Sequence, residues 1–302
     1  MARSSSATRS EEGESIRGRE YILSKQLAWA RGRDIELVGS RVDRGRPCYT
    51  PTLEQNLFAP LLPDVEASFL RGSGGELGGG LNPGKMQALH SSSALGVNVF
   101  QYWITVDDSA SIAAACGLCR RGSGDPERIE FEAQYPIDDR FAVPPNLDVV
   151  IHNRSGARIR AHAIECKFSE AYGSREHAGL KPAYLGLEYV WGKIPALRDL
   201  AVRISPTDAV FELLHGAQLI KHILGLTREY GHGRFRLLYL WYDVLGPEGV
   251  AHRRDVEHFA SAATSDGVLF HALTYQELVL GMARTFGDKH EEYVQYLTDR
   301  YV

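Results

Sequence analysis

The sequence lacks any apolar run long enough to cross a membrane, and its first residues lack the apolar core of a secretory signal. We therefore expect a cytoplasmic protein that spans no membrane. Only four of the 302 residues are cysteine, which argues against a small disulfide-stapled domain. Cys116 and Cys119 have the spacing of metal ligands, but no second close pair exists, so we interpret them as the end of a packed, alanine-rich helix.

The sequence also lacks a strong excess of either charge. Its net charge of −4 predicts no general attraction to nucleic acid, although a local basic surface can still contact phosphates. Arg154, Arg158 and Arg160 are candidates for such a surface, and the alternative is a solvated group of charges. The hydrophobic content of 44% and the charged content of 24% are ordinary for a globular protein.

The composition changes along the chain and suggests three parts. Residues 1–14 are rich in serine, arginine and glutamate and are expected to be disordered. Residues 15–84 contain several prolines and a cluster of glycines, which predicts an extension of short helices and loops. Residues 85–302 are expected to form an α/β domain, with an irregular insertion at 169–206.

Hydrophobic periodicity predicts the order of the secondary structure. Ser91, Ser92 and Ser93 can cap one helix, and Asp208 can cap another. We expect helices over residues 15–30, 53–58, 65–70, 94–103, 109–118, 209–230, 254–263, 275–284 and 289–301, and strands over 128–133, 147–152, 159–168, 235–244 and 268–273. A hairpin followed by strand-helix-strand units predicts a mixed sheet with helices on both faces.

Two opposite charges, Glu165 and Lys167, lie two residues apart in an otherwise apolar strand. Strand side chains alternate, so both point to one face. The preceding strand of the hairpin carries Asp148. A four-residue loop would place Asp148 directly opposite Glu165, whereas a two-residue loop would place it opposite Ala163 and diagonal to Glu165. Both loops put the three charged side chains on one face.

These three side chains suggest a particular chemistry. Two neighbouring carboxylates repel each other and favour a cation between them, and oxygen ligands suit magnesium or manganese. Lys167 could then hold an oxygen of a scissile phosphate, or orient and help to deprotonate the attacking water. The set is typical of phosphodiester hydrolysis, and we prefer this interpretation to a structural salt bridge among Asp148, Glu165 and Lys167.

In this context the chain resembles the PD-(D/E)xK nuclease superfamily, which has the restriction-endonuclease-like fold. Pro145-Asn146-Leu147-Asp148 corresponds to the Pro-Asp half with two residues inserted, and Glu165-Cys166-Lys167 to the other half. Segments 91–100, 131–132 and 146–150 are similar to a bacterial subgroup of restriction endonucleases. The resemblance covers about Ser91 to Leu273 and implies an αβββαβ core with helical N- and C-terminal additions.

The resemblance also implies further site residues. The superfamily often has a Gln or Glu on the helix after the Glu-x-Lys strand, and Gln218 fits this role, with His222 one turn later on the same face. Gln218 could instead form only a helix-to-sheet hydrogen bond. Many members have an additional early acid as a metal ligand. Glu132 and Glu76 are the two candidates for it, without a preference between them, although for each we favour a structural or surface role over that of a ligand.

The function implied is that of a Mg²⁺- or Mn²⁺-dependent endonuclease that hydrolyses DNA, leaves a 5′-phosphate and takes part in bacterial defence against foreign DNA. RNA remains open as a substrate. One rival is a repair or recombination nuclease, such as a junction resolvase. Another is a module of nuclease fold that binds nucleic acid without cleaving it. We expect either a homodimer or a partner protein of a defence system.

Overall fold

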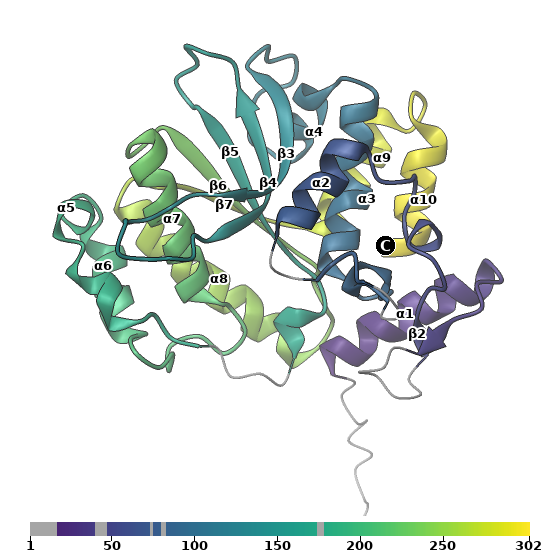
Figure 1. Ribbon diagram of the computed structural model, residues 1–302, viewed down its shortest axis with the longest axis horizontal. Helices are drawn as coiled ribbons and strands as arrows, with labels where there is room; N and C mark the ends of the chain where they lie inside the picture. Colours follow the sequence, from purple (N-terminus) through teal and green to yellow (C-terminus); the bar gives the residue numbers. More distant parts are fainter. Residues whose placement is uncertain (1–16, 40–46, 73–74, 80–82, 174–177) are drawn as a thin grey trace, which may run out of the picture.

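A five-stranded sheet forms the centre of the protein, in the order β3-β4-β5-β6-β7 (Figure 1). The computed structural model describes residues 17–39, 47–72, 75–79, 83–173 and 178–302, so the predicted disordered tail lies outside the described residues. The strands of the central sheet are β3 (Pro126–Gln134), β4 (Asn146–Asn153), β5 (Ala161–Lys167), β6 (Phe235–Trp241) and β7 (Leu269–Thr274). A separate antiparallel pair consists of β1 (Val38–Gly39) and β2 (Pro47–Tyr49).

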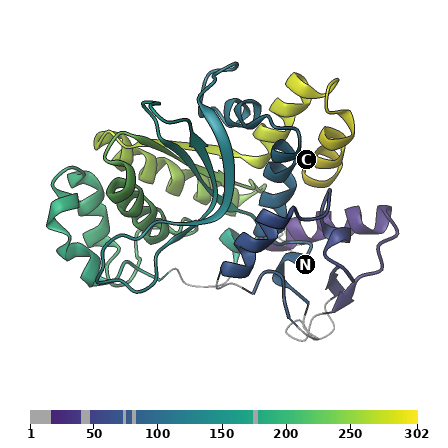
Figure 2. The ribbon, with the colours of Figure 1, turned by 45° about the horizontal axis from the view of Figure 1, so that its top comes forward.

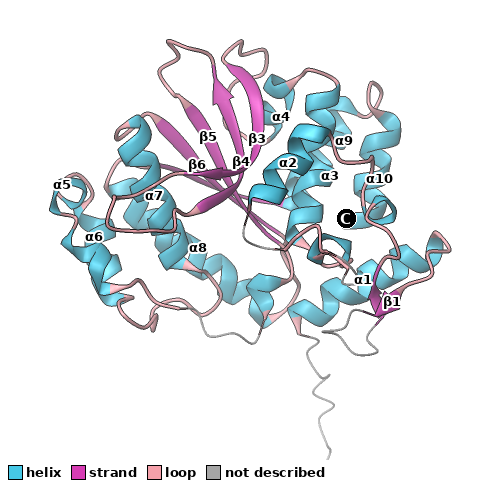
Figure 3. Cartoon of the chain, viewed as in Figure 1, coloured by secondary structure: helices cyan, strands magenta, loops and turns pink. Residues whose placement is uncertain are grey.

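The central sheet is mixed, as the sequence predicted. Strands β3, β4 and β5 pair antiparallel, whereas β5, β6 and β7 pair parallel. Strands β5 and β6 are buried along almost their whole length because helices cover both faces of the sheet (Figure 3). The antiparallel strands curve strongly away from the parallel half, as Figure 2 shows.

Two layers of helices enclose this sheet (Figure 1). One layer contains α5 to α8, and the other contains α3, α4, α9 and α10 with α1 and α2 against them. The helices are α1 (Gly18–Gly32), α2 (Pro63–Arg71), α3 (Ser92–Thr105), α4 (Ser109–Ala115), α5 (Glu188–Trp191), α6 (Pro195–Arg203), α7 (Gly216–Tyr230), α8 (Pro247–Ser265), α9 (Tyr275–Phe286) and α10 (Glu291–Tyr301). Short 3-10 helices are η1 (Glu54–Asn56), η2 (Lys85–Gln87), η3 (Glu170–Tyr172) and η4 (Pro182–Gly186).

Local capping explains where two helices begin. The Ser91 hydroxyl accepts a hydrogen bond from the backbone N–H of Ala94 at the start of α3, as predicted. At the start of α9, Thr274 and Glu277 form a reciprocal capping box. Cys116 follows directly after α4 and is a free thiol, in agreement with its interpretation as a helix end.

The helix after the insertion begins later than predicted, at Gly216. The predicted cap, Asp208, instead accepts hydrogen bonds from the N–H groups of residues 210 and 211 and closes a turn. Asp255 of α8 then accepts the N–H groups of residues 212–214. Because the carboxylate of Asp255 binds these three N–H groups, residues 212–214 stay outside the helix, and α7 begins only at Gly216.

Two further boundaries correct the sequence analysis. In its described residues, the insertion at 169–206 is not irregular, because they contain η3, η4, α5 and α6. Helix α6 begins where Asp266, from the end of α8, accepts the N–H groups of Ala196 and Leu197, at 3.0 and 2.7 Å. Helix α8 begins earlier than predicted, at Pro247, a residue type that favours the first turn of a helix.

A buried arginine connects α1 and α10. Arg300 is 1% exposed, and its guanidinium donates to Gln26, Tyr296 and both oxygens of Asn56. It also lies 4.0 Å from the centroid of the Trp29 ring. These neutral acceptors and the aromatic ring replace the water that the buried charge loses.

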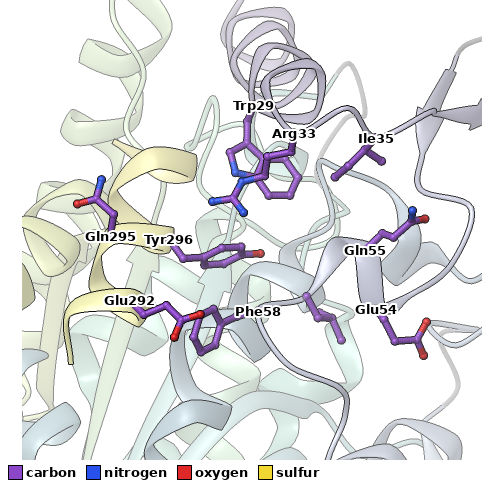
Figure 4. Close-up of a pocket in the computed structure, with 10 residues that line it drawn as sticks. Trp29, Arg33, Ile35, Glu54, Gln55, Phe58, Glu292, Gln295 and Tyr296 are labelled. Atoms are coloured by element: carbon purple, nitrogen blue, oxygen red, sulfur yellow. The ribbon is translucent and has the colours of Figure 1, made fainter.

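A pocket of about 550 Å³ lies beside this network, between α1, η1 and α10 (Figure 4). Trp29, Phe58 and Tyr296 form its aromatic walls, and the guanidinium of Arg33 lies 5.4 Å from the Trp29 ring centroid. None of the residues predicted for catalysis lines this pocket. The residues predicted for catalysis lie instead on the central sheet and on α7 beside it.

Candidate active site

Asp148, Glu165 and Lys167 lie together at the open end of the β4–β5 hairpin. The ladder pairs Val149 with Ile164, so the next position along the strands places Asp148 opposite Glu165. This is the register that the four-residue loop predicted. Lys167, at the end of β5, is on the same face of the strand as Glu165.

The hydrogen-bond ladder between β4 and β5 ends just before this site. Asp148 uses its side chain instead, and its Oδ2 accepts the N–H of Cys166 at 2.7 Å. No described residue donates a hydrogen bond to the other carboxylate oxygen of Asp148. Burial, followed by repulsion from the Glu165 carboxylate, raises the pKa of Asp148 well above its ordinary value, against the attraction of Lys167. A cation bound here would therefore stabilise the ionised form of Asp148.

Glu165 is completely buried and lies between two basic side chains. Its Oε1 is 2.5 Å from Nζ of Lys167, and its Oε2 is 2.9 Å from Nε2 of His222 on α7. Burial alone would raise the pKa of Glu165, but Lys167 and His222 lower it to about 2. Burial would likewise lower the pKa of Lys167, but Glu165 and Asp148 raise it above its ordinary value. Glu165 is thus ionised and Lys167 protonated at neutral pH.

Glu132 completes a row of three carboxylates across neighbouring strands. The residues on either side of Glu132 pair with those on either side of Asp148, so the two acids stand opposite each other. Glu132 has a φ angle of 54°, a conformation that non-glycine residues rarely adopt and that costs about 1–3 kcal/mol. This kink turns Phe131 and Ala133 toward opposite helical layers, although they are two residues apart. Such strain in an edge strand is characteristic of functional sites.

The two early acids lie close to each other. Burial raises the pKa of Glu132, a hydrogen bond of 3.1 Å from Asn146 opposes this, and the carboxylates of Glu76 and Glu165 raise it further. Burial also raises the pKa of Glu76, although Lys85 lies 3.9 Å away. The structure therefore places Glu132 in the row itself and Glu76 next to Glu132.

The carboxylates fit a hard divalent cation by their chemistry. The row supplies oxygen donors only, and the pKa values of Asp148 and Glu132 are raised, first by burial and then by the neighbouring carboxylates. Within the residues that the structure describes, however, no three His, Cys, Asp or Glu side chains are arranged as a finished metal cluster. The two oxygens of Glu165 lie against Lys167 and His222.

Helix α7 contributes a residue that the sequence analysis noted without assigning a role. His222 touches Glu165, whereas Gln218, one turn earlier, is half-buried and forms no side-chain hydrogen bond with the described residues. The only sequence signal for His222 was its position four residues after Gln218. Gln218 stays a prediction, and its proximity to His222 places it on the helix face nearest the site.

The arginines predicted to contact nucleic acid are not near the row. The N–H of Asn153 binds the carbonyl oxygen of Arg160, so Arg154 and Arg158 belong to the connection that closes the hairpin. Arg154 also pairs with Asp125 at 2.9 Å. This connection lies at the end of β5 opposite to Lys167, about 20 Å away at the usual rise of a strand.

Comparisons with known proteins identify the family. The family model described as "restriction endonuclease associating with ARP" matches residues 30–302. Neither the search of the curated proteins nor that of the solved structures finds a match. No helix in the described part of the chain is long and apolar enough to span a membrane. The match covers most of the chain, including every residue of the carboxylate row, and the chain belongs to this family of restriction endonucleases associating with ARP.

Proposed function

We propose that the protein is a magnesium- or manganese-dependent endonuclease that hydrolyses DNA. The observation that carries this proposal is the buried Glu165–Lys167 pair beside Asp148 at the open end of a hairpin. Two carboxylates and a lysine on one face provide ligands for a cation and a positive charge for a phosphate. The family name, which implies a restriction endonuclease, supports DNA as the substrate.

Asp148 and Glu165 would hold the divalent cation, with Glu132 as a further ligand. The bound ion would supply Lewis acidity and lower the pKa of water, which makes hydrolysis possible near neutral pH. The β3–β4 register places Glu132 opposite Asp148, and the carboxylate of Glu132 lies near enough to raise the pKa of Asp148. His222 positions Glu165 by its contact with Oε2. Gln218 remains our candidate for orienting the water or the DNA backbone.

Lys167 has the clearest role among the residues of the chain. Its raised pKa keeps it protonated, so it is suited to bind a nonbridging oxygen of the scissile phosphate rather than to remove a proton from water. The attacking water forms a bond to phosphorus and releases a proton to solvent. The bond to the 3′-oxygen breaks and this oxygen takes up a proton, which leaves a 3′-hydroxyl and a 5′-phosphate. The ammonium group of Lys167 stabilises the negative charge that develops on the phosphate oxygens in this step.

We infer a role in bacterial defence and the need for a partner protein. The family description speaks of association with ARP, which favours a heteromeric complex over a homodimer. Copurification of the tagged protein from cells that express its native neighbouring genes tests this inference. A complex of defined stoichiometry supports it, and a stable homodimer that cleaves DNA unaided contradicts it.

A cleavage assay tests the central proposal. Supercoiled plasmid is incubated with the wild-type protein in Mg²⁺, Mn²⁺ or EDTA, beside Asp148→Asn and Lys167→Met. We expect cleavage only with metal and only by the wild type. Asp288→Asn removes an exposed carboxylate far from the row and is the matched control. Equal cleavage by Asp148→Asn would contradict the mechanism.

The same preparation distinguishes the rival functions. Plasmid, single-stranded DNA, branched DNA and RNA are offered at equal concentrations. Preference for a four-way junction would support a recombination nuclease, and preference for RNA would replace DNA as the substrate. Binding without cleavage of any substrate, in Mg²⁺ or Mn²⁺, would support a module that only binds nucleic acid.

A further inference from the structure

A second cavity, of about 290 Å³, lies between the chain that leads into β4, the segment after residue 177 and the start of α7. The described residues that line it carry charge of only one sign. Lys181 and Lys221 line it together with His215, and no acidic residue among those described does. Within the described residues, neither lysine forms an ion pair with an acid. Two cations that line one cavity and have no ion-pairing acid among the described residues indicate a site for an anion.

The position of the cavity connects it with the carboxylate row. Pro145 lines the cavity and lies three residues before Asp148 on the same chain. Lys221 precedes His222, the residue that touches Glu165. The cavity and the row thus lie at the same end of the sheet, where β5 and β6 end and α7 begins. Ligands of parallel sheets usually bind at this carboxyl end of the strands.

Helix α7 adds a further favourable feature for an anion. Its first turn contributes Ala217 to the lining, and no side chain caps this end of the 15-residue helix. The helix dipole favours negative charge at this end. Lys221 is half-buried, and burial lowers its pKa, while the nearby Glu165 opposes this and Lys181 reinforces it. A bound anion would offset the repulsion between the two lysines.

We propose that this cavity binds a backbone phosphate of the DNA strand that is cleaved, next to the scissile phosphate. The proposal rests on the proposed nuclease function and extends it with a residue-level contact. The carboxylate row repels DNA until a cation binds, and the contact with Lys181 and Lys221 gives the strand an anchor that does not depend on this cation. The anchor would set which phosphate reaches Lys167.

Binding measurements test the contact separately from cleavage. Fluorescence anisotropy of a labelled duplex is measured in an Asp148→Asn background, which prevents the proposed cleavage. We expect the Lys181→Gln/Lys221→Gln pair to lower affinity about tenfold and to reduce the slope of log K against log salt by about two. The Arg/Arg pair at these positions should retain most of the affinity. Lys193→Gln/Lys289→Gln removes two exposed charges outside the cavity and should change the affinity little.

A scan of the DNA backbone locates the phosphate. A neutral methylphosphonate replaces one linkage at a time, and one position beside the cleavage site should weaken binding about tenfold. The Lys181→Gln/Lys221→Gln protein should be insensitive at that position and normal at all others. If the double variant does not fold, Lys181→Gln alone, an exposed change, should still show reduced sensitivity there. Inorganic phosphate is added as a competitor, to distinguish a site for free phosphate from one for DNA.

The outcomes separate this proposal from the nuclease function. Wild-type binding without cleavage, but with the lysine-dependent position in the scan, supports the anchor and contradicts the nuclease function. Metal-dependent cleavage with no such position, or with affinity unchanged in the lysine variants, overturns the anchor and leaves the nuclease function in place. Competition by inorganic phosphate with no effect of any DNA linkage also overturns it.

Discussion

Replacing Asp148 by asparagine should make the metal-free protein more stable while it abolishes cleavage. Asp148 is held by the N–H of Cys166, and an asparagine carbonyl can accept the same hydrogen bond. The change removes a negative charge next to Glu165 and Glu132, which repel it. An imperfectly compensated buried polar group typically costs about 1–3 kcal/mol. We therefore expect the free energy of unfolding to rise by about 1–2 kcal/mol.

The gain in stability from Asp148→Asn should depend on pH, in a direction that the raised pKa of Asp148 sets. The pKa of Asp148 is raised in the folded protein, so folding favours the protonated form and the ionised carboxylate destabilises the fold. The difference between Asp148→Asn and the wild type should be largest above the folded pKa of Asp148. It should shrink as the pH falls toward 4, near the ordinary pKa of an aspartate, where both states bind the proton.

Thermal unfolding followed by circular dichroism measures the effect. At about 2–4 °C per kcal/mol, the melting temperature in EDTA should rise by about 2–8 °C at pH 8. Added Mg²⁺ at ten times its dissociation constant should stabilise the wild type by about 1.4 kcal/mol and the variant much less. Asp288→Asn should show neither change. A lower melting temperature of Asp148→Asn at pH 8, or an equal response to Mg²⁺, would refute the reasoning.

Three further changes test the surroundings of the row. Lys167→Met should leave Glu165 with only one basic neighbour, destabilise the protein by about 3 kcal/mol in urea titrations and reduce cleavage at least about 100-fold. His222→Leu frees Glu165 to move and should raise the Mg²⁺ concentration for half-maximal cleavage about tenfold. His222→Gln should bring this concentration part of the way back to the wild-type value. An unchanged Mg²⁺ dependence of His222→Leu would contradict the positioning role. Asp255→Ala should cost about 2–4 kcal/mol, because three backbone N–H groups before α7 lose their acceptor, and a smaller loss would show that water replaces it.

The strained residue Glu132 links the shape of the sheet to the chemistry of the row. Its positive φ angle allows β3 to curve while the side chain stays opposite Asp148. A regular strand would have a lower backbone energy, but it would point Phe131 and Ala133 toward the same helical layer. The kink thus costs stability at the edge of the sheet and directs Phe131 and Ala133 to different helical layers, while the β3–β4 register keeps Glu132 opposite Asp148.

Local rules determined the core of the site from the sequence. Alternation along a strand put Glu165 and Lys167 on one face, and the even hairpin register added Asp148, because both depend only on positions within about 20 residues. The mixed sheet followed from the order of hairpin and strand-helix-strand units. The caps of α3 and α9 also depend on side chains within three residues of each other.

Only the tertiary structure decided what reaches the site from distant parts of the chain. The start of α7 depends on Asp255, about 40 residues away, and that start brings His222 against Glu165. The choice between Glu132 and Glu76 depends on the pairing of β3 with β4, which places Glu132 opposite Asp148. The meeting of Lys181 with Lys221 depends on how the segment before α6 returns to α7. Such contacts arise from packing between separate elements, whereas periodicity and capping describe only the chain next to each residue.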